Sequence, residues 1–256
     1  MTDKSPSVLS TLDGSIARIT LNRPEKRNAL NEALVSGIKS ALRKANAIDA
    51  VRVVVITGAG QDFCSGADLE ALRKISEASV SENVEDALSL MELFELIREV
   101  PVPVVAAVRG RALAGGCGLA SACDLVLAAS SARFGYPEVK IGFVPAMVMA
   151  FLKRNVSEKR AFELLTRGAE ITAEEAMKIG LVNQVFSNDT FDDQVKAYIS
   201  GFEKVSKSAI ALTKRLLYQT DGMAFSEALE TGVDVNVIAR LTEDCQKGIG
   251  RFTEKG

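Results

Sequence analysis

A glycine-rich turn and a single acidic residue are the parts of this sequence best suited to chemistry. Gly115, Gly116 and Gly118 lie between an apolar strand and a predicted short helix. N–H groups at a helix start have no backbone partner, and together with the helix dipole they favour a developing negative charge. Glu138 lies among aromatic and aliphatic residues, where desolvation would raise its pKa towards the range useful for proton transfer. This combination suits enolate chemistry on a thioester.

A second donor of the same kind is expected in segment 63–68, Phe-Cys-Ser-Gly-Ala-Asp, a turn that follows another apolar strand. Two N–H groups from separate turns would form an oxyanion hole, an arrangement worth roughly 3–4 kcal/mol per donor in acyl chemistry. Asp68 directly precedes a predicted helix, so we expect its side chain to be the N-cap, with a structural role.

Two other interpretations of the glycine turn stay open at this point. Glycines also allow a helix to pack closely on a sheet, and a helix start can cradle a phosphate. The turn matches neither G-x-G-x-x-G nor a Walker motif with its Lys-Ser/Thr pair. A dinucleotide or ATP site therefore has weak support.

The complete absence of histidine among 256 residues is the strongest negative signal. It excludes Ser-His-Asp and Cys-His nucleophiles, H-E-x-x-H zinc sites and imidazole bases. The four cysteines contain no C-x-x-C pair and are predicted to be reduced packing residues. We expect no metal site and no tightly bound cofactor. Because histidine is absent, acid–base catalysis must come from Asp, Glu, Lys, Tyr or backbone dipoles.

A parallel α/β layout is predicted to position these residues. Buried strands are expected at 51–56, 104–108 and 123–128 because each is a short, nearly continuous apolar run. Helices alternate with them, at 31–48, at 69–100 with an interruption near 79–83, and directly after the glycine turn. The alternation predicts right-handed βαβ crossovers.

The two ends of the chain follow different patterns. An antiparallel hairpin of strands 8–12 and 16–21 is predicted at the start, with Asp13-Gly14 as its tight turn. From Pro145 onward the apolar spacing is helical almost without strands, and helices are expected at 147–154, 157–166, 173–179, 189–205, 207–219, 226–241 and 243–251. We predict a catalytic core over 1–190 and a helical region over 191–256 that covers the site or packs on another subunit.

The composition is that of an ordinary globular protein. Apolar residues make up 47% and charged residues 25%, with 31 basic against 33 acidic side chains. This balance indicates neither disorder nor a nucleic-acid partner. Residues 1–7 lack a signal-peptide pattern, and no apolar run reaches the roughly 18 residues of a membrane span. The expectation is a cytoplasmic protein with no membrane partner.

Four motifs taken together resemble the crotonase superfamily, the enoyl-CoA hydratase/isomerase group. They are Leu-Asn-Arg-Pro-Glu-Lys-Arg-Asn-Ala-Leu at 21–30, Phe-Cys-Ser-Gly-Ala-Asp-Leu at 63–69, Ala-Leu-Ala-Gly-Gly-Cys-Gly-Leu-Ala at 112–120 and Phe-Thr-Glu-Lys at 252–255. Their order and spacing cover nearly the whole chain. The resemblance implies a spiral of ββα units followed by a C-terminal all-helical region, assembled as a homotrimer or a dimer of trimers.

The resemblance also implies roles for individual residues. The backbone N–H groups of Cys64 and Gly115 would bind the thioester oxygen of an acyl-CoA substrate, with Glu138 as the catalytic carboxyl. Coenzyme A would enter as part of that substrate. Residues implied in binding the CoA thioester are Lys26, Ala67, Asp68, Leu69, Gly116, Phe252 and Lys255, of which the last two can reach the CoA of a neighbouring subunit.

Gly118 is the main departure from the pattern, because many hydratases carry a second glutamate at this position. Glu138 alone can shuttle a proton within an enolate, as an isomerase requires. Hydration also needs an oriented water, for which Tyr136 or a water in the space left by Gly118 are candidate helpers. The same space could hold a bulkier or branched acyl group, and the expected hydratase substrate is a short-chain or branched 2-enoyl-CoA. The sequence favours an enoyl-CoA hydratase over a 3-enoyl-CoA to 2-enoyl-CoA isomerase narrowly, on the similarity of 134–145 to bacterial hydratases. A CoA-binding protein that has lost catalysis is the third alternative.

Overall fold

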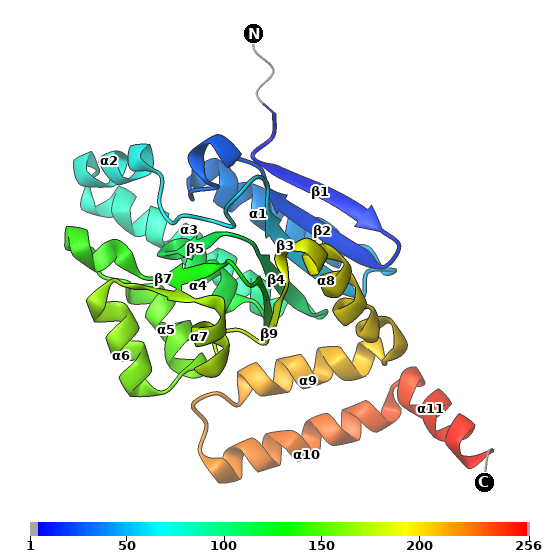
Figure 1. The fold of residues 1–256 in the computed structure, drawn as a ribbon. Coiled ribbons are helices and arrows are strands. Elements are labelled where there is room, and N and C mark those ends of the chain that lie inside the picture. Colours follow the sequence, from blue (N-terminus) through cyan, green and yellow to red (C-terminus); the bar gives the residue numbers. More distant parts are fainter. Residues whose placement is uncertain (1–4, 255–256) are drawn as a thin grey trace.

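The protein is built around a six-stranded sheet (Figure 1). The computed structural model describes residues 5–254, with only the backbone described at Leu69 and Phe252. In spatial order the strands are β1 (Val8–Asp13), β2 (Ile16–Leu21), β3 (Val53–Gly58), β4 (Val104–Val108), β6 (Leu125–Ala129) and β9 (Gln184–Phe186). Only the β1–β2 pair is antiparallel within this sheet. The predicted hairpin is confirmed, and Gly14 takes the positive φ of 59° that its turn requires.

Both faces of the sheet are buried, as the continuous apolar strands predict. Val54 and Ile56 face the main core, whereas Val53 and Val55 face a smaller cluster closed by α8 (Phe191–Ile199). Helices on the main-core side are α1 (Glu32–Asn46), α3 (Val80–Glu99) and α4 (Gly115–Ala122). The alternation of side chains along each strand assigns neighbouring residues to opposite layers.

A second sheet of three short strands carries the ends of the glycine turn. It consists of β5 (Arg111–Leu113), β7 (Arg133–Gly135) and β8 (Glu170–Thr172), with β5 and β7 parallel. None of these strands was predicted, and the expectation of a tail almost without strands is corrected by β8 and β9. Each has three residues, too few for an alternating pattern to be recognised.

The predicted helices are found with adjusted ends. The segment 69–100 forms two helices, α2 (Leu69–Glu77) and α3. They are separate because Ser79 is the N-cap of α3, where its side-chain oxygen accepts a hydrogen bond from the N–H of Glu82. The expected helix 189–205 is regular only over α8, flanked by 3-10 turns. The helices after Pro145 are α5 (Ala146–Asn155), α6 (Glu158–Arg167), α7 (Ala173–Lys178), α9 (Lys207–Gln219), α10 (Phe225–Leu241) and α11 (Glu243–Thr253).

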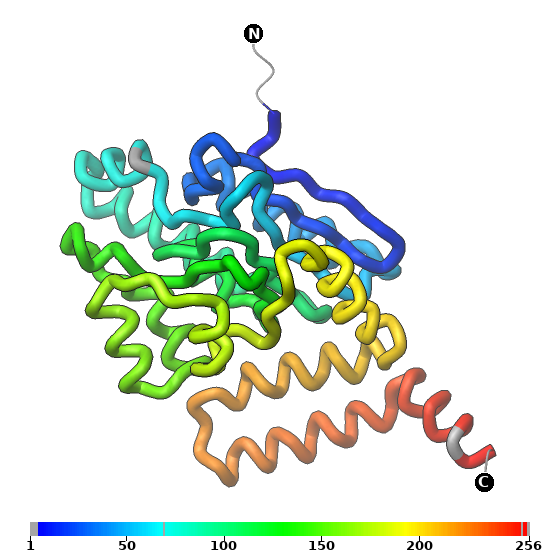
Figure 2. Tube along the Cα trace, in the orientation of Figure 1, coloured from blue at the N-terminus to red at the C-terminus, as the bar shows by residue number. Residues whose placement is uncertain are grey.

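The last three helices extend from the body of the molecule, and α10 runs alongside α9 (Figures 1 and 2). Helix α9 is fixed to the core by Lys214, which is 8% exposed. Its Nζ donates to Asp124 Oδ2 at 2.6 Å and to the carbonyl oxygens of Ile97 and Val102 at 2.9 and 3.2 Å. Tyr218, one turn further along α9, donates its hydroxyl to Asp124 Oδ1 at 2.5 Å. A buried polar cluster therefore holds α9 in place.

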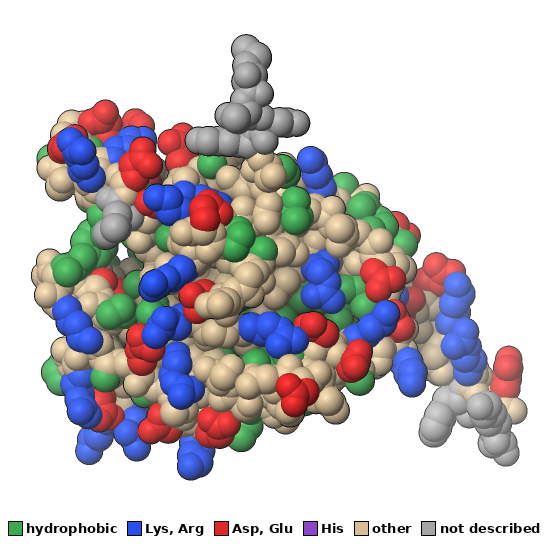
Figure 3. Space-filling view, turned by 45° about the horizontal axis from the view of Figure 1, so that its top comes forward, with side chains coloured by type: hydrophobic (Ala, Val, Ile, Leu, Met, Phe, Trp, Pro, Cys, Tyr) green, Lys and Arg blue, Asp and Glu red, His purple; other side chains and the backbone are tan. Residues whose placement is uncertain are grey.

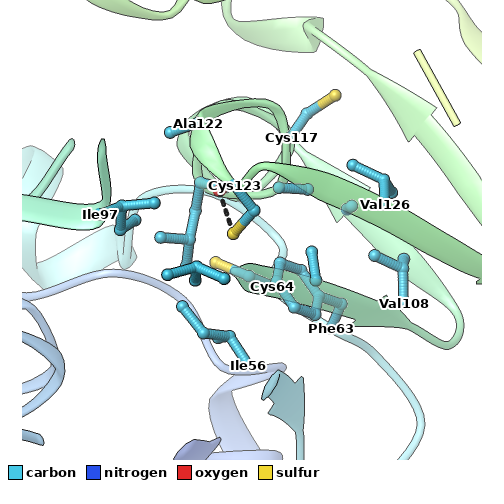
Figure 4. Close-up of a cluster of buried hydrophobic side chains, with 14 of the residues drawn as sticks. Ile56, Phe63, Cys64, Ile97, Val108, Cys117, Ala122, Cys123 and Val126 are labelled. Atoms are coloured by element: carbon cyan, nitrogen blue, oxygen red, sulfur yellow. Dashed lines mark hydrogen bonds between the residues drawn. The ribbon is translucent and has the colours of Figure 1, made fainter. Parts of the chain in front are cut away.

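The cysteines behave as the sequence predicts. All four are free thiols, and Cys64, Cys117 and Cys123 are buried. In Figure 4, Cys64 and Cys123 point into one apolar cluster while Cys117 points away from it. Burial raises the pKa of Cys64 to about 12 and that of Cys117 to about 11. These thiols stay protonated at neutral pH and serve as packing residues.

The face of the molecule drawn in Figure 3 shows no strong charge asymmetry. On the face drawn in Figure 3, acidic and basic side chains are interspersed, consistent with a formal net charge of −2. Over residues 5–254, no group of three or more Cys, Asp or Glu is placed to hold a metal ion. Among the described helices, none is both long and apolar enough to cross a membrane.

Candidate active site

The two glycine-containing turns meet next to the small sheet. Cys64 forms a parallel bridge with Ala112, and the N–H of Leu113 donates to Cys64 O at 2.9 Å. On the other side of β5, the N–H of Ala114 donates to Gly135 O at 2.8 Å. Segment 63–68, the start of α4 and the residues after β7 are thereby brought to one place, as the sequence predicts.

Gly115 begins α4, so its N–H has no partner within the helix. The first N–H of this segment that bonds back into the helix belongs to Gly118, which donates to Ala114 O at 2.9 Å. Gly115 is partly exposed. Its N–H is available to an incoming oxygen, in agreement with the role that the resemblance implies.

Cys64 does not have the predicted availability. Its N–H donates to Arg111 O at 3.0 Å as part of the bridge to β5, and the residue is fully buried. The N–H of the next residue, Ser65, donates to Arg27 O at 3.1 Å. The assignment of the second donor to Cys64 is therefore wrong, because the pairing of this segment with β5 uses that N–H.

Ala67, three residues further on, has an N–H group that could take this role instead. The bridge between Leu30 and Ala67 is made by the N–H of Leu30 to Gly66 O at 2.6 Å and the N–H of Asp68 to Leu30 O at 3.1 Å. In such a parallel bridge, the N–H of the middle residue points away from the bonded neighbour. Ala67 is exposed, and no hydrogen bond of its N–H is found among the described residues. Segment 63–68 thus contains a donor, three residues after the predicted position.

The turn at Ala67 is held by a buried ion pair. Asp68 is 4% exposed, accepts from Arg23 at 2.5 Å, and caps α2 by accepting from the N–H of Glu70 at 2.9 Å. The Arg23 hydrogen bond holds the pKa of Asp68 below its usual value, and the charge of exposed Lys26 contributes in the same direction. The predicted N-cap is confirmed. Sequence reasoning missed Arg23, although it lies within the quoted motif 21–30.

Glu138 lies two residues after Tyr136 and three after Gly135, the last residue of β7. Its Oε2 is buried and has no hydrogen-bond partner among the described residues. Desolvation by burial raises the pKa of this carboxyl. Because β5 and β7 are parallel, with Leu113 opposite Gly135, Glu138 and Gly115 follow the same end of the two strands. The expected desolvation of this carboxyl, with its raised pKa, is confirmed.

The space next to Gly118 is filled by Val148. A Cβ atom placed on Gly118 would overlap Cγ1 of Val148 and lie 2.9 Å from its Cβ. Val148 is 5% exposed and belongs to α5, which packs on α4. The expectation that Gly118 leaves room for an ordered water or a larger acyl group is therefore wrong, because a valine from another helix fills that room.

Tyr136 is a packing residue. It is fully buried and its hydroxyl lies 3.3 Å from the hydroxyl of Ser121, within hydrogen-bond distance. Burial raises the pKa of the Tyr136 phenol well above its usual value. Neither of the two helpers expected for hydration is thus in place.

The remaining predicted residues are distributed over several elements. Gly116 permits close packing, since a Cβ there would lie 2.7 Å from Cβ of Cys64. Leu69 is the first residue of α2, Phe252 lies in α11, and Lys255 falls outside the described residues. Sequence reasoning missed Val148 because its only signal is a valine in a helical pattern.

Comparison with known proteins places this geometry in a family. The profile of the enoyl-CoA hydratase/isomerase family matches residues 11–256. A Thermus thermophilus protein, named as an enoyl-CoA hydratase, is 42% identical over 94% of this chain and 96% of its own. The 2,3-dehydroadipyl-CoA hydratase of Escherichia coli is 34% identical over 93% of this chain and 91% of its own. An enoyl-CoA hydratase structure from Mycobacterium smegmatis superposes with a TM-score of 0.93 at 31% identity, covering 98% and 97% of the two chains.

The fold and the two opposed turns define an acyl-CoA enzyme with the crotonase fold. The chain belongs to the enoyl-CoA hydratase/isomerase family. This confirms the predicted α/β spiral with its C-terminal helices.

Proposed function

We propose that the protein converts 3-enoyl-CoA thioesters into 2-enoyl-CoA thioesters, with Glu138 as the only carboxyl that moves a proton. One observation carries this proposal: Val148 fills the space next to Gly118 in which a second carboxyl would stand. This leaves Glu138, whose Oε2 is buried without a hydrogen-bond partner among the described residues, as the proposed proton carrier. A double-bond shift needs one proton shuttle, whereas hydration also needs an oriented water.

The N–H groups of Ala67 and Gly115 are the proposed oxyanion hole. Neither has a backbone partner among the described residues, and the two turns are in contact through Gly66 and Ala114. Two donors aimed at the thioester oxygen would stabilise the enolate that forms when a proton leaves C2. The negative charge is then delocalised over the oxygen and the carbons up to C4.

Glu138 would first act as the base that removes the C2 proton, in its ionised form, and then return the proton to C4. The double bond moves from C3–C4 to C2–C3, and no other atom enters or leaves. The raised pKa of Glu138 supports this role, because a carboxyl with a higher proton affinity is a stronger base.

Hydration of a 2-enoyl-CoA to a 3-hydroxyacyl-CoA is the second candidate. The names of the relatives favour it, including a crotonyl-CoA hydratase from Syntrophomonas wolfei that is 34% identical. In this chain Glu138 would have to orient the water alone. A protein that binds acyl-CoA without converting it is the third candidate, and acyl chain length stays open for all three.

The CoA part of the substrate is proposed to bind along Ala67, Asp68 and Leu69, with Gly116 at the thioester and Lys26 near the phosphates. Lys26 is exposed and close enough to Asp68 to lower its pKa. Phe252 and Lys255 are proposed to reach the CoA of a neighbouring subunit in a trimer or a dimer of trimers. Exposed apolar residues on α10, such as Leu229 and Val233, support burial against another subunit. A core over 1–190, a helical region over 191–256, a cytoplasmic location and the lack of a tightly bound cofactor stay predictions.

The test is product analysis with 3-enoyl-CoA and 2-enoyl-CoA substrates in deuterated water. Isomerisation yields a product with a shifted double bond and no added water, with deuterium at C4 in proportion to exchange on the carboxyl. A product heavier by one water from 2-enoyl-CoA, with no conversion of 3-enoyl-CoA, would replace the proposal by hydration. Binding without conversion of either substrate would select the third candidate.

A further inference from the structure

Ala114, the residue before Gly115, has a backbone conformation that L-amino acids rarely adopt. Its φ is 50° and its ψ is −124°, outside the left-handed helical region as well as the two common regions. Among residues 5–254, the other non-glycine residues with positive φ are Arg27 and Asn28, and Arg27 has ordinary left-handed values of 49° and 37°. Strain of this kind persists only where the surroundings impose it.

Hydrogen bonds on both sides of Ala114 impose this conformation. Its N–H donates to Gly135 O at 2.8 Å, which continues the pairing of β5 with β7. Its carbonyl oxygen accepts from the N–H of Gly118 at 2.9 Å, which starts the ladder of α4. The chain passes from strand to helix at this single residue, so the change of direction is concentrated in its two dihedral angles.

The strained conformation determines where the N–H of Gly115 points. In a trans peptide the C=O and N–H bonds point in opposite directions. Because the carbonyl of Ala114 is directed into α4 towards Gly118, the N–H of Gly115 is directed out of the helix start. A relaxed backbone at residue 114 would turn this peptide and with it the donor.

The methyl group of Ala114 contacts the second turn. A Cβ atom placed on Gly66 would lie 2.8 Å from Cβ of Ala114, so the Gly66 backbone is packed directly against this methyl group. Gly66 has a φ of 98° and is followed by Ala67. The side chain of Ala114 is thus a spacer between the turns that carry the two donors.

We infer that Ala114 is a positioning residue: its strained backbone aims the N–H of Gly115, and its methyl group sets the distance to the Ala67 turn. The inference rests on the proposed oxyanion hole, but not on which reaction follows. It makes a specific prediction, because glycine adopts these dihedral angles without strain and lacks the spacer.

The experiment compares Ala114→Gly with the wild-type chain in stability, turnover and polarisation of a bound thioester. Relief of strain is expected to raise the Tm of the variant. Its kcat is expected to fall by about 10- to 100-fold with little change in KM, because without the methyl spacer the Ala67 turn can shift, and a small misplacement of a donor acts on the transition state. The matched control is Ala197→Gly on an exposed position of α8, where the same change should lower Tm and leave kcat unchanged.

Polarisation is read with 4-(dimethylamino)cinnamoyl-CoA, a chromophoric thioester whose absorbance moves to the red when its carbonyl accepts strong hydrogen bonds. The wild-type chain should shift the band, and Ala114→Gly should shift it less at saturating ligand. An equal shift and an equal kcat in the variant would overturn the role of Ala114. If the wild-type chain shifts the band without converting any enoyl-CoA, the proposed function is wrong. The positioning role of Ala114 is then decided by whether the variant shifts the band less than wild type.

Discussion

Two largely buried carboxyl groups in this protein have opposite surroundings. Asp124 accepts from the N–H of Val104 at 2.7 Å, from Lys214 at 2.6 Å and from Tyr218 at 2.5 Å. Glu138 has one buried oxygen with no hydrogen-bond partner within residues 5–254. A carboxylate that accepts from several donors ties the elements that carry them together, whereas a buried one without donors gains affinity for a proton. The first group therefore maintains the fold, and the second is available for chemistry.

The largest expected effect comes from removing the proton-carrying group. Glu138→Gln should lower kcat by about 10²–10⁴-fold. The glutamine side chain has nearly the same shape as glutamate, but its amide cannot take up and return a proton. Binding of CoA thioesters, measured by calorimetry, should stay nearly unchanged. Full turnover in the variant would contradict the proposed difference between Asp124 and Glu138, since Glu138 would then have no role in the reaction.

Breaking the Asp124 cluster should affect stability instead. Lys214→Met removes the cation and leaves a buried carboxylate with fewer donors, so the free energy of unfolding should fall by about 3–5 kcal/mol in a denaturant titration. Lys207→Met is the matched control on the same helix, because Lys207 pairs with the fully exposed Asp49. If the free energy of unfolding falls by the same small amount in both variants, the Asp124 cluster does not hold α9 in place.

A third experiment changes the neighbourhood of Glu138. The double variant Gly118→Glu with Val148→Gly makes room for a second carboxyl and should raise the ratio of hydrated to isomerised product by roughly tenfold or more. Gly118→Glu alone should fold poorly because its Cβ overlaps Val148. An unchanged product ratio in the folded double variant would show that Val148 does not select the reaction.

The smallest expected effect is a pH dependence of stability. Burial raises the pKa of Glu138 in the folded chain above its ordinary value of 4.5. The associated stabilisation is present in full below pH 4.5 and is lost as the pH rises through the raised pKa. Glu138→Gln removes this loss, so the variant should gain stability relative to wild type as the pH rises through this range. The measurement is the Tm as a function of pH. In the control Glu95→Gln, at an exposed position of α3, the Tm should follow that of wild type.

The sequence predicted the elements with strong periodicity and the residues with unusual chemistry. The strands around Val54 and Val105 are continuous apolar runs, and Glu138 is an acidic residue inside an apolar segment, so both could be recognised locally. The N-cap at Asp68 follows from its position before a helix. These features depend on neighbours in the chain.

The features that were missed depend on neighbours in space. Whether the N–H of Cys64 or of Ala67 is free depends on which of them pairs with β5, which has three residues and no pattern of its own. Val148 reaches Gly118 from 30 residues away by the packing of two helices. A single sequence contains no record of such contacts, and the oxyanion donor was therefore misplaced while its segment was correct.

The bond between Asp124 and Lys214 joins residues 90 positions apart. During synthesis, strands β4 and β6 leave the ribosome well before α9 does. Until residue 214 is available, the carboxylate of Asp124 at the start of β6 has no lysine partner, and this end of the strand cannot reach its final burial. Completion of this part of the core therefore waits until α9 has been made, and a chain cut short before α9 would leave Asp124 and the carbonyl groups of Ile97 and Val102 without their lysine donor.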